Sequence, residues 1–259
     1  MAYAAGVMST SAADSTAKAV RRGLALVACL ALSLTMASGA SAAANVSSTS
    51  AKQVLTQSLR NATHAGSVRI TVQFFSGSTT GKVVQDSGLK TGEQTVAIGN
   101  ELASVVLVNS TAYISGNSKG LSSYFGMPSS LVPSIVGHWA SVQQSDPSFG
   151  SVAGNVTLVP ALANVTPSGT LIAGKRTKVD RQWVRSISGE GPDASGRVTL
   201  FVTANSRSLP VEAVESSGTS TQNKGEIVTF TRWGETLHLP RPTNAVPLST
   251  LEAAAAEGS

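Results

Sequence analysis

The strongest constraint that the sequence places on the fold is a strict alternation of apolar and polar residues. Residues 68–74 read Val-Arg-Ile-Thr-Val-Gln-Phe, so one face of an extended strand would meet a core and the other would meet water. This segment and the apolar segments after it are separated by short turns rich in glycine, asparagine, aspartate and serine. Such spacing is typical of an antiparallel meander. Further strands are expected at residues 81–85, 93–98, 103–108, 111–115, 170–172, 182–187, 198–203, 210–216 and 226–232.

The middle of the chain, residues 117–167, differs from the segments on both sides. Glycine and proline recur in it too often for long helices, so we expect short helices joined by loops. Its apolar content is nevertheless high, which predicts that it packs over one face of the sheet. The two patterns together predict an α+β domain, in which a mostly antiparallel sheet has its helices gathered on one side.

Residues 18–42 have the three parts of a secretory signal peptide. Three basic residues between positions 18 and 22 precede an apolar stretch over residues 23–37, and Ala40-Ser41-Ala42 offers small residues for cleavage. The apolar stretch is too short for a comfortable transmembrane helix. We therefore expect an exported protein of the extracellular space or the cell envelope, with membrane anchoring as an alternative that depends on the cysteine.

The single cysteine, Cys29, lies inside the signal segment. The run Leu26-Val27-Ala28-Cys29 resembles the lipobox at which bacterial lipoproteins are cut and acylated, so Cys29 is a candidate lipidation site. However, apolar residues continue to Met36, where a lipoprotein would begin a polar tether, and we favour cleavage after Ala42. In either case the domain itself has no cysteine, and so no disulfide, thiolate ligand or cysteine nucleophile.

The sequence divides into four parts. Residues 1–42 are the signal peptide, 43–50 a small polar linker, 51–240 the domain and 241–259 an extended or disordered tail. A helix is expected from Ser50, because Leu55 and Leu59 lie four residues apart on one helical face and Gly66 follows as a stop signal.

Charge excludes one class of partner. The signal segment holds three of the 19 basic residues and one of the 14 acidic residues, which leaves a net charge near +3 on the remainder. This charge is too small and too dispersed for a nucleic-acid-binding protein, which usually carries a clustered basic face. We expect no nucleic-acid partner.

Two motifs match enzyme signatures only in part. Residues 116–120, Gly-Asn-Ser-Lys-Gly, have the spacing of a nucleophile elbow around Ser118, but the flanks lack the parallel α/β context and predict a turn. Residues 169–176 nearly match a phosphate-binding loop, but Arg176 stands where a hydroxyl ligand to Mg²⁺ is needed. We expect a strand ending in a basic turn there, and we keep an exported hydrolase using Ser118 as a remote alternative.

The titratable residues suggest no metal or catalytic site. His64, His138 and His238 lie far apart in the sequence, and the carboxylates are scattered without an obvious pair. We therefore expect no catalytic residue, no metal and no cofactor, and a protein that is not an enzyme.

Two stretches carry a resemblance to a known family. They are residues 139–162, which begin Trp-Ala-Ser-Val and contain Pro-Ser-Phe at 147–149, and residues 228–240, which read Val-Thr-Phe-Thr-Arg-Trp-Gly-Glu and end in Leu-Pro. With residues 111–114 and 208–212 they resemble the LppX and LprG group of mycobacterial lipoproteins, which is similar in structure to the LolA carrier. The resemblance spans residues 51–240.

The resemblance implies a curved antiparallel half-barrel with short helices closing its concave face. A cavity between sheet and helices would take the acyl chains of lipids or lipoglycans. The alternative is that the same side chains simply fill a core. The residues expected to face the cavity are Val68, Ile70, Val72, Phe74, Val105, Leu107, Leu131, Ile135, Val198, Leu200 and Val202.

These observations lead to two main hypotheses. The first is a monomeric, non-enzymatic envelope protein that binds or carries a lipid or other apolar ligand, with a membrane surface as a further candidate partner. The second is a structural or sensory envelope domain with a filled core, which contacts a protein partner through an edge strand.

Overall fold

The computed structural model describes residues 44–76, 79–192, 196–216 and 224–257. The predicted signal peptide and Cys29 lie outside these residues. The helices are α2 (Ala44–Ala65), α3 (Ser118–Phe125), α4 (Val132–Ile135), α5 (Phe149–Gly154), α6 (Leu158–Ala163) and α7 (Leu248–Glu257). The strands are β1 (Ser67–Ser76), β2 (Thr79–Gly88), β3 (Gly92–Ile98), β4 (Glu101–Val108), β5 (Thr111–Gly116), β6 (Ala140–Gln143), β7 (Ser168–Val179), β8 (Gln182–Glu190), β9 (Arg197–Thr203), β10 (Pro210–Ser216), β11 (Lys224–Thr231) and β12 (Val246–Pro247).

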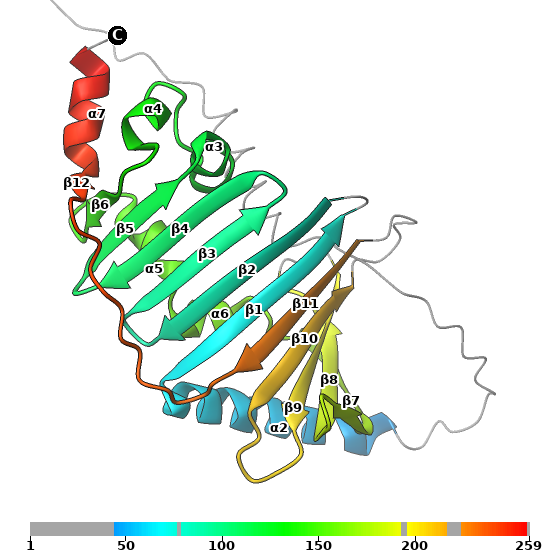
Figure 1. The fold of residues 1–259 in the computed structure, drawn as a ribbon. Coiled ribbons are helices and arrows are strands. Elements are labelled where there is room, and N and C mark those ends of the chain that lie inside the picture. The colour runs from blue at the N-terminus through cyan, green and yellow to red at the C-terminus, as the bar shows by residue number, and fades with distance from the viewer. Residues whose placement is uncertain (1–43, 77–78, 193–195, 217–223, 258–259) are drawn as a thin grey trace, which may run out of the picture.

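All twelve of these strands form one open sheet in the order β12-β6-β5-β4-β3-β2-β1-β11-β10-β9-β8-β7. Every pair is antiparallel except β12 with β6. The sheet twists strongly, α2 crosses the end that contains β7 to β11, and α5 and α6 lie behind the sheet in the view of Figure 1. The predicted fold class, a curved antiparallel sheet with helices on its concave face, is confirmed. In the described part of the chain no helix is long and apolar enough to cross a bilayer.

Short turns set the register of neighbouring strands. Asn109 and Ser110 between β4 and β5 have φ angles of 51° and 60°, and Asp180 and Arg181 between β7 and β8 have 44° and 65°. Two successive residues with positive φ form the turn whose twist matches that of a β-hairpin. The sequence identified the first turn but placed the end of β7 too early. Residues 169–176 lie within β7, which confirms a strand and excludes a phosphate-binding loop.

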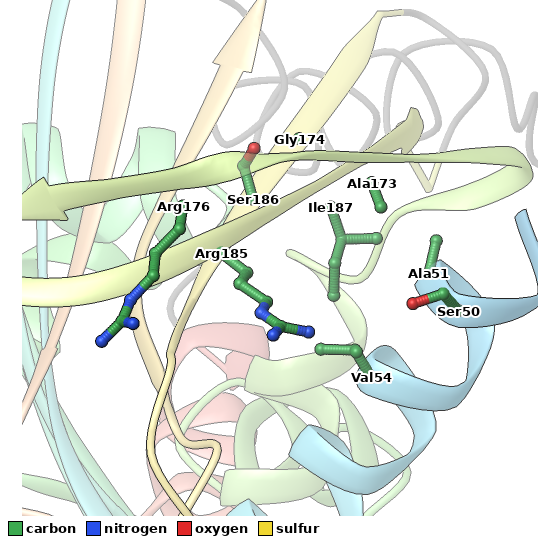
Figure 2. A pocket seen from close by; sticks show the side chains of 9 residues that line it. All are labelled: Ser50, Ala51, Val54, Ala173, Gly174, Arg176, Arg185, Ser186 and Ile187. Carbon is green, nitrogen blue, oxygen red and sulfur yellow. The ribbon is translucent and has the colours of Figure 1, made fainter. Parts of the chain in front are cut away.

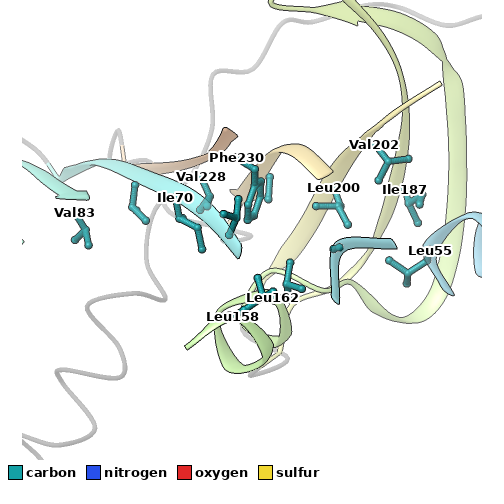
Figure 3. Packing of buried hydrophobic residues seen from close by; sticks show 14 of the residues in the cluster. Leu55, Ile70, Val83, Leu158, Leu162, Ile187, Leu200, Val202, Val228 and Phe230 are labelled. Carbon is teal, nitrogen blue, oxygen red and sulfur yellow. The ribbon is translucent and has the colours of Figure 1, made fainter. Parts of the chain in front are cut away.

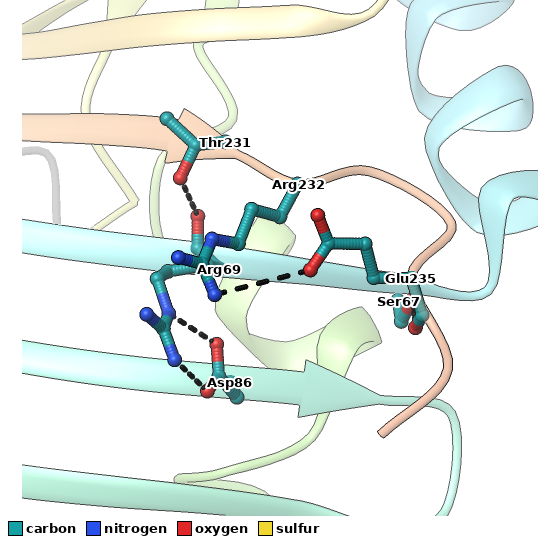
Figure 4. Close-up of polar contacts among 6 residues, drawn as sticks. All are labelled: Ser67, Arg69, Asp86, Thr231, Arg232 and Glu235. Carbon is teal, nitrogen blue, oxygen red and sulfur yellow. Dashed lines mark hydrogen bonds and ion pairs between the residues drawn. The ribbon is translucent and has the colours of Figure 1, made fainter. Parts of the chain in front are cut away.

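An ion pair joins β1 and β2 on the outer face of the sheet. The Arg69 guanidinium donates to both carboxylate oxygens of Asp86, at 2.7 Å and 2.5 Å, and Thr231 of β11 donates to the Arg69 carbonyl (Figure 4). Hydrogen bonding to Arg69 holds the pKa of Asp86 below its usual value. The geometry of two parallel hydrogen bonds fixes β1 against β2 at the centre of the sheet.

Two expectations about the ends of the domain are wrong. Residues 43–50 were expected to be a linker, but α2 begins at Ala44. The tail after residue 240 was expected to be extended or disordered, but it adds β12 to the sheet and forms α7, whose Leu248 is buried in the core. The tail is short of large apolar residues, and Leu248, Leu251 and Ala255 of α7 pack against the second cluster of the core.

The middle segment has the expected short helices, and glycine sets how closely one of them packs. A Cβ on Gly120 in α3 would clash with the carbonyl oxygen of Leu102 in β4, and a Cβ on Gly116 would lie 2.6 Å from the same oxygen. Asn117 caps α3, since its side chain accepts from the Gly120 amide at 2.8 Å. The glycines around Ser118 are therefore explained by helix–strand packing.

Substitution of Gly120 tests this packing. We expect Gly120→Ala to lower the free energy of unfolding by about 2 kcal/mol, because the added methyl group must displace backbone. Gly150→Ala in α5 is the matched control, since its Cβ would meet nothing within 4 Å and should stabilise by up to ~1 kcal/mol. Urea denaturation measures both. Equal effects of the two substitutions would contradict the role of Gly120.

Candidate functional site: the concave face and its two hollows

Strand register places rows of side chains across the concave face. One row runs through Ile187 of β8, Leu200 of β9, Ala213 of β10, Val228 of β11 and Val72 of β1. These five side chains belong to one buried apolar cluster, part of which Figure 3 shows. Because residues two apart share a face, the neighbouring rows also point inward. The result is an apolar wall over most of this end of the sheet.

A buried polar ladder interrupts the wall between β2 and β3. The Gln94 amide donates to the Gln85 carbonyl oxygen at 2.7 Å, and the Gln85 amide donates to the Ser87 hydroxyl at 2.6 Å. The hydroxyl of Tyr124, from α3, donates to Gln94, and burial raises the pKa of Tyr124 to about 12. Each of these bonds satisfies a buried polar group, so the ladder holds α3 at one place on the sheet.

The structure places ten of the eleven residues predicted to face a cavity in or against two buried clusters. Val68, Ile70, Val72, Leu200 and Val202 are buried in the cluster under α2 and α6, with Phe74 packed against it. The second cluster, under α3, α4 and α5, contains Val105, Leu107, Leu131 and Ile135. Val198 of β9 is also buried.

Neither of the two hollows described below is lined by any of these eleven residues. Their side chains point inward, but other side chains of the core pack over them. Whether they ever contact a ligand stays a prediction.

The first hollow lies between the N-terminal half of α2 and the β7–β8 hairpin. We call it the arginine hollow, because the guanidinium groups of Arg176 and Arg185 hang from neighbouring strands, that of Arg185 toward Val54 of α2 (Figure 2). Its volume is about 280 Å³. The lining residues are Ser50, Ala51, Val54, Ala173, Gly174, Arg176, Arg185, Ser186 and Ile187.

The second hollow, the apolar hollow, lies between the C-terminal half of α2, α6 and the start of β7. Its volume is about 420 Å³, within the range of roughly 300–1,000 Å³ typical of small-molecule sites. Thr63 and Thr166 donate their hydroxyls to backbone carbonyls of their own helical turns, and Ser168 donates to the Glu190 carbonyl. The polar groups of the lining are thus already paired. The lining residues are Leu59, Thr63, Val159, Leu162, Ala163, Thr166, Ser168 and Pro192.

Helix α2 separates the two hollows and contacts the sheet through small side chains. Ala51, Ser58 and Ala62 are fully buried on its inner face, together with Leu55. Ser58 is unusual because its buried hydroxyl has no hydrogen-bond partner among the described residues. Small side chains bury little apolar area, so this contact holds α2 less firmly than a row of leucines would.

A buried carboxyl group lies on the same concave face, near the start of β11. Glu226 is 3% exposed and points inward with Val228 and Phe230. It stands opposite Phe74 of β1 and Glu215 of β10. Burial, and secondarily the charge of Glu215, raise the pKa of Glu226 from 4.5 to about 8. The group is therefore mostly neutral near pH 7.

Sequence reasoning missed the two features that define the hollows. It assigned the cover to residues 117–167 and gave α2 no part in it, because the small residues of the inner face carry no hydrophobic signal. It also treated the basic residues as dispersed, whereas Lys175, Arg176, Lys178, Arg181 and Arg185 share one hairpin. They lie within eleven consecutive residues, so the local density of basic residues was a signal that could have identified this cluster.

No known protein family and no curated protein matches the sequence. Solved structures do match. The lipoprotein LppX of Mycobacterium tuberculosis is 15% identical with a TM-score of 0.47, over 75% of this chain and all of LppX. An uncharacterised conserved protein of Thermus thermophilus is 11% identical with a TM-score of 0.43, over 76% of this chain and 98% of that one.

A third match is MucB, solved in complex with the periplasmic part of MucA. It is 11% identical with a TM-score of 0.38, over 70% of this chain and 56% of MucB. The chain is thus similar to the LppX structure that its sequence resembles, but membership of the LppX and LprG group is not shown. At these scores the likeness assigns neither ligand nor function.

The raised pKa of Glu226 predicts a loss of stability with rising pH. Between pH 4.5 and about 8 the unfolded chain ionises this group while the folded chain keeps it neutral, and above pH 8 the charge is buried. We expect Glu226→Gln to raise the free energy of unfolding at pH 8.5 by a few kcal/mol, at about 1.4 kcal/mol per pKa unit. Near pH 4 the gain should vanish.

Denaturant unfolding at pH 4, 6 and 8.5 measures this effect. Glu252→Gln, at an exposed position of α7, is the control and should show no such trend. A Glu226→Gln effect that does not change with pH would contradict the assignment of a buried, neutral carboxyl group.

Proposed function

We propose that this chain is an exported, non-enzymatic envelope protein that binds an acyl chain or a similar apolar ligand in the apolar hollow. The observation that carries the proposal is the lining of that hollow, where five of eight residues are apolar and the three hydroxyls are paired with backbone. Such a lining favours a ligand that brings no polar groups of its own. The signal-peptide pattern at residues 18–42 supports export.

The size of the hollow suits part of an acyl chain. Each buried CH₂ contributes about 0.8 kcal/mol, so seven methylenes would contribute roughly 5–6 kcal/mol before the cost of ordering the ligand. No catalytic group is required for binding of this kind. A longer chain would have to part α2 from the sheet, and the small residues on the inner face of α2 support such a movement.

The second candidate function is that of a structural or sensory envelope domain, which has a filled core and binds a protein partner. It is favoured by the close packing of the inward residues, nine of which belong to two buried clusters. The edge strand β7, which is exposed along most of its length, would then offer the contact surface. This candidate requires no ligand in either hollow.

Filling the apolar hollow separates the two candidates. Ala163→Trp places an indole in the hollow from an exposed position at the end of α6, and we expect it to weaken uptake of a fluorescent fatty acid at least tenfold. Ala254→Trp, at an exposed position of α7, is the matched control and should change uptake less than twofold. Fluorescence titration of the purified protein measures both.

Native mass spectrometry of protein purified from its own membrane provides an independent test. Copurified lipid that is absent from the Ala163→Trp variant is the expected result. If no lipid copurifies and the unsubstituted protein takes up no fatty acid, the carrier proposal is wrong and the filled core is favoured.

A further inference from the structure

The β7–β8 hairpin gathers positive charge at one edge of the sheet. Residues 175–185 hold five basic residues and one acidic residue, Asp180. The net charge of this segment is therefore +4, whereas the whole chain after residue 42 carries about +3. The rest of the chain after residue 42 is thus slightly acidic. We call these five side chains, with Trp183, the hairpin patch. Its basic residues are Lys175, Arg176, Lys178, Arg181 and Arg185.

The members of the hairpin patch are exposed, and its cations are not neutralised by the protein. All five basic residues are exposed. Within the described part of the chain none of them forms an ion pair. Arg176 stands directly opposite Arg185 across the two strands. Like charges at directly opposed positions destabilise a strand pair, so the pairing is unfavourable unless an anion lies against it.

A large aromatic side chain stands among these cations. Trp183 is 49% exposed. The Arg176 guanidinium lies 4.8 Å from its ring centroid and the Lys178 ammonium 4.9 Å. Ile172, on the same hairpin, is also 49% exposed. Tryptophan prefers the boundary between water and lipid, where its ring is partly buried and its N–H stays hydrated.

We propose that the hairpin patch docks on an anionic membrane surface, with the basic side chains against lipid phosphates and Trp183 at the headgroup level. Charge complementarity favours this partner, and the exposed indole favours a bilayer over a purely polar anionic surface. An acidic protein would satisfy the cations equally well but gives Trp183 no comparable apolar layer.

The position of the patch links docking to the hollows. Arg176 and Arg185 also line the arginine hollow beside α2 (Figure 2), so docking would bring the membrane to the N-terminal half of the cover. The inference is independent of the proposed ligand, because the patch would bind a membrane whether or not the apolar hollow is filled.

Vesicle binding tests the proposal. The purified protein should bind vesicles of phosphatidylglycerol and phosphatidylcholine in equal parts at 50 mM salt, should bind pure phosphatidylcholine at least tenfold more weakly, and should lose most binding at 500 mM salt. The triple variant Lys175→Gln, Lys178→Gln, Arg181→Gln spares the arginine hollow. We expect it to weaken binding on the order of 100-fold, from a roughly fivefold loss per basic residue.

The matched control removes the same charge elsewhere. Lys82→Gln, Lys90→Gln and Arg207→Gln lie at exposed positions outside the hairpin and should change binding less than threefold. Trp183→Phe should abolish the blue shift of tryptophan emission that accompanies binding. Uptake of fatty acid in vesicle-free solution should be unchanged in the triple variant, which separates this proposal from that of the hollow.

Three outcomes would overturn the proposal. They are no binding to anionic vesicles at 50 mM salt, equal losses in the hairpin and control triple variants, and binding to polyglutamate as tight as to vesicles without a shift in the emission of Trp183. The last result would identify an acidic protein as the partner.

Discussion

The continuous antiparallel register of the sheet is the constraint on which the rest of the structure depends. From β6 to β8 each strand is hydrogen-bonded to two neighbours. Because side chains alternate with period two, the pairing fixes which residue of every strand faces inward. The apolar wall, the polar ladder at Gln85 and Gln94, and the buried Glu226 all occupy inward positions of this one register. A slip of one residue in β11 would exchange Val228 and Phe230 for threonines.

The apolar concave face must be covered to be shielded from water, and the helices that cover it are attached to the sheet in different ways. α3 is held by a glycine contact with β4 and by hydrogen bonds from Asn117 and Tyr124. α2 has a polar anchor at its flank, where the Asn61 amide donates to the Arg207 carbonyl. On its inner face Ser58 is unpaired among the described residues, and Ala51 and Ala62 are small. The two hollows lie at either end of α2, whose inner face packs on the sheet mainly through small side chains. Space remains where short side chains meet a curved sheet.

The sequence predicted those elements whose own residues determine them. The alternating segment at residues 68–74 became β1, and residues 210–216 became β10 with the same bounds. β7 was predicted over three residues and spans twelve, because most of its side chains are exposed and its second half has no apolar alternation. Its structure comes from pairing with β8. α7 has the same origin, because it packs on β6 and on α4, which are distant in sequence. The candidate site was missed for this reason, since both hollows lie where α2 meets such partners.

The basic residues of β7 have a second physical explanation besides membrane docking, namely protection of an edge strand. An exposed edge strand invites pairing with another chain, and lysine or arginine along it prevents this. Edge protection accounts for Lys175, Arg176 and Lys178, all on β7. It does not account for Arg185 and Trp183, because β8 is paired on both sides, with β7 and β9, and needs no protection. The cations of β7 can serve both purposes. The indole of Trp183, which contacts Arg176 and Lys178, adds nothing to edge protection and fits a surface that is anionic and partly apolar.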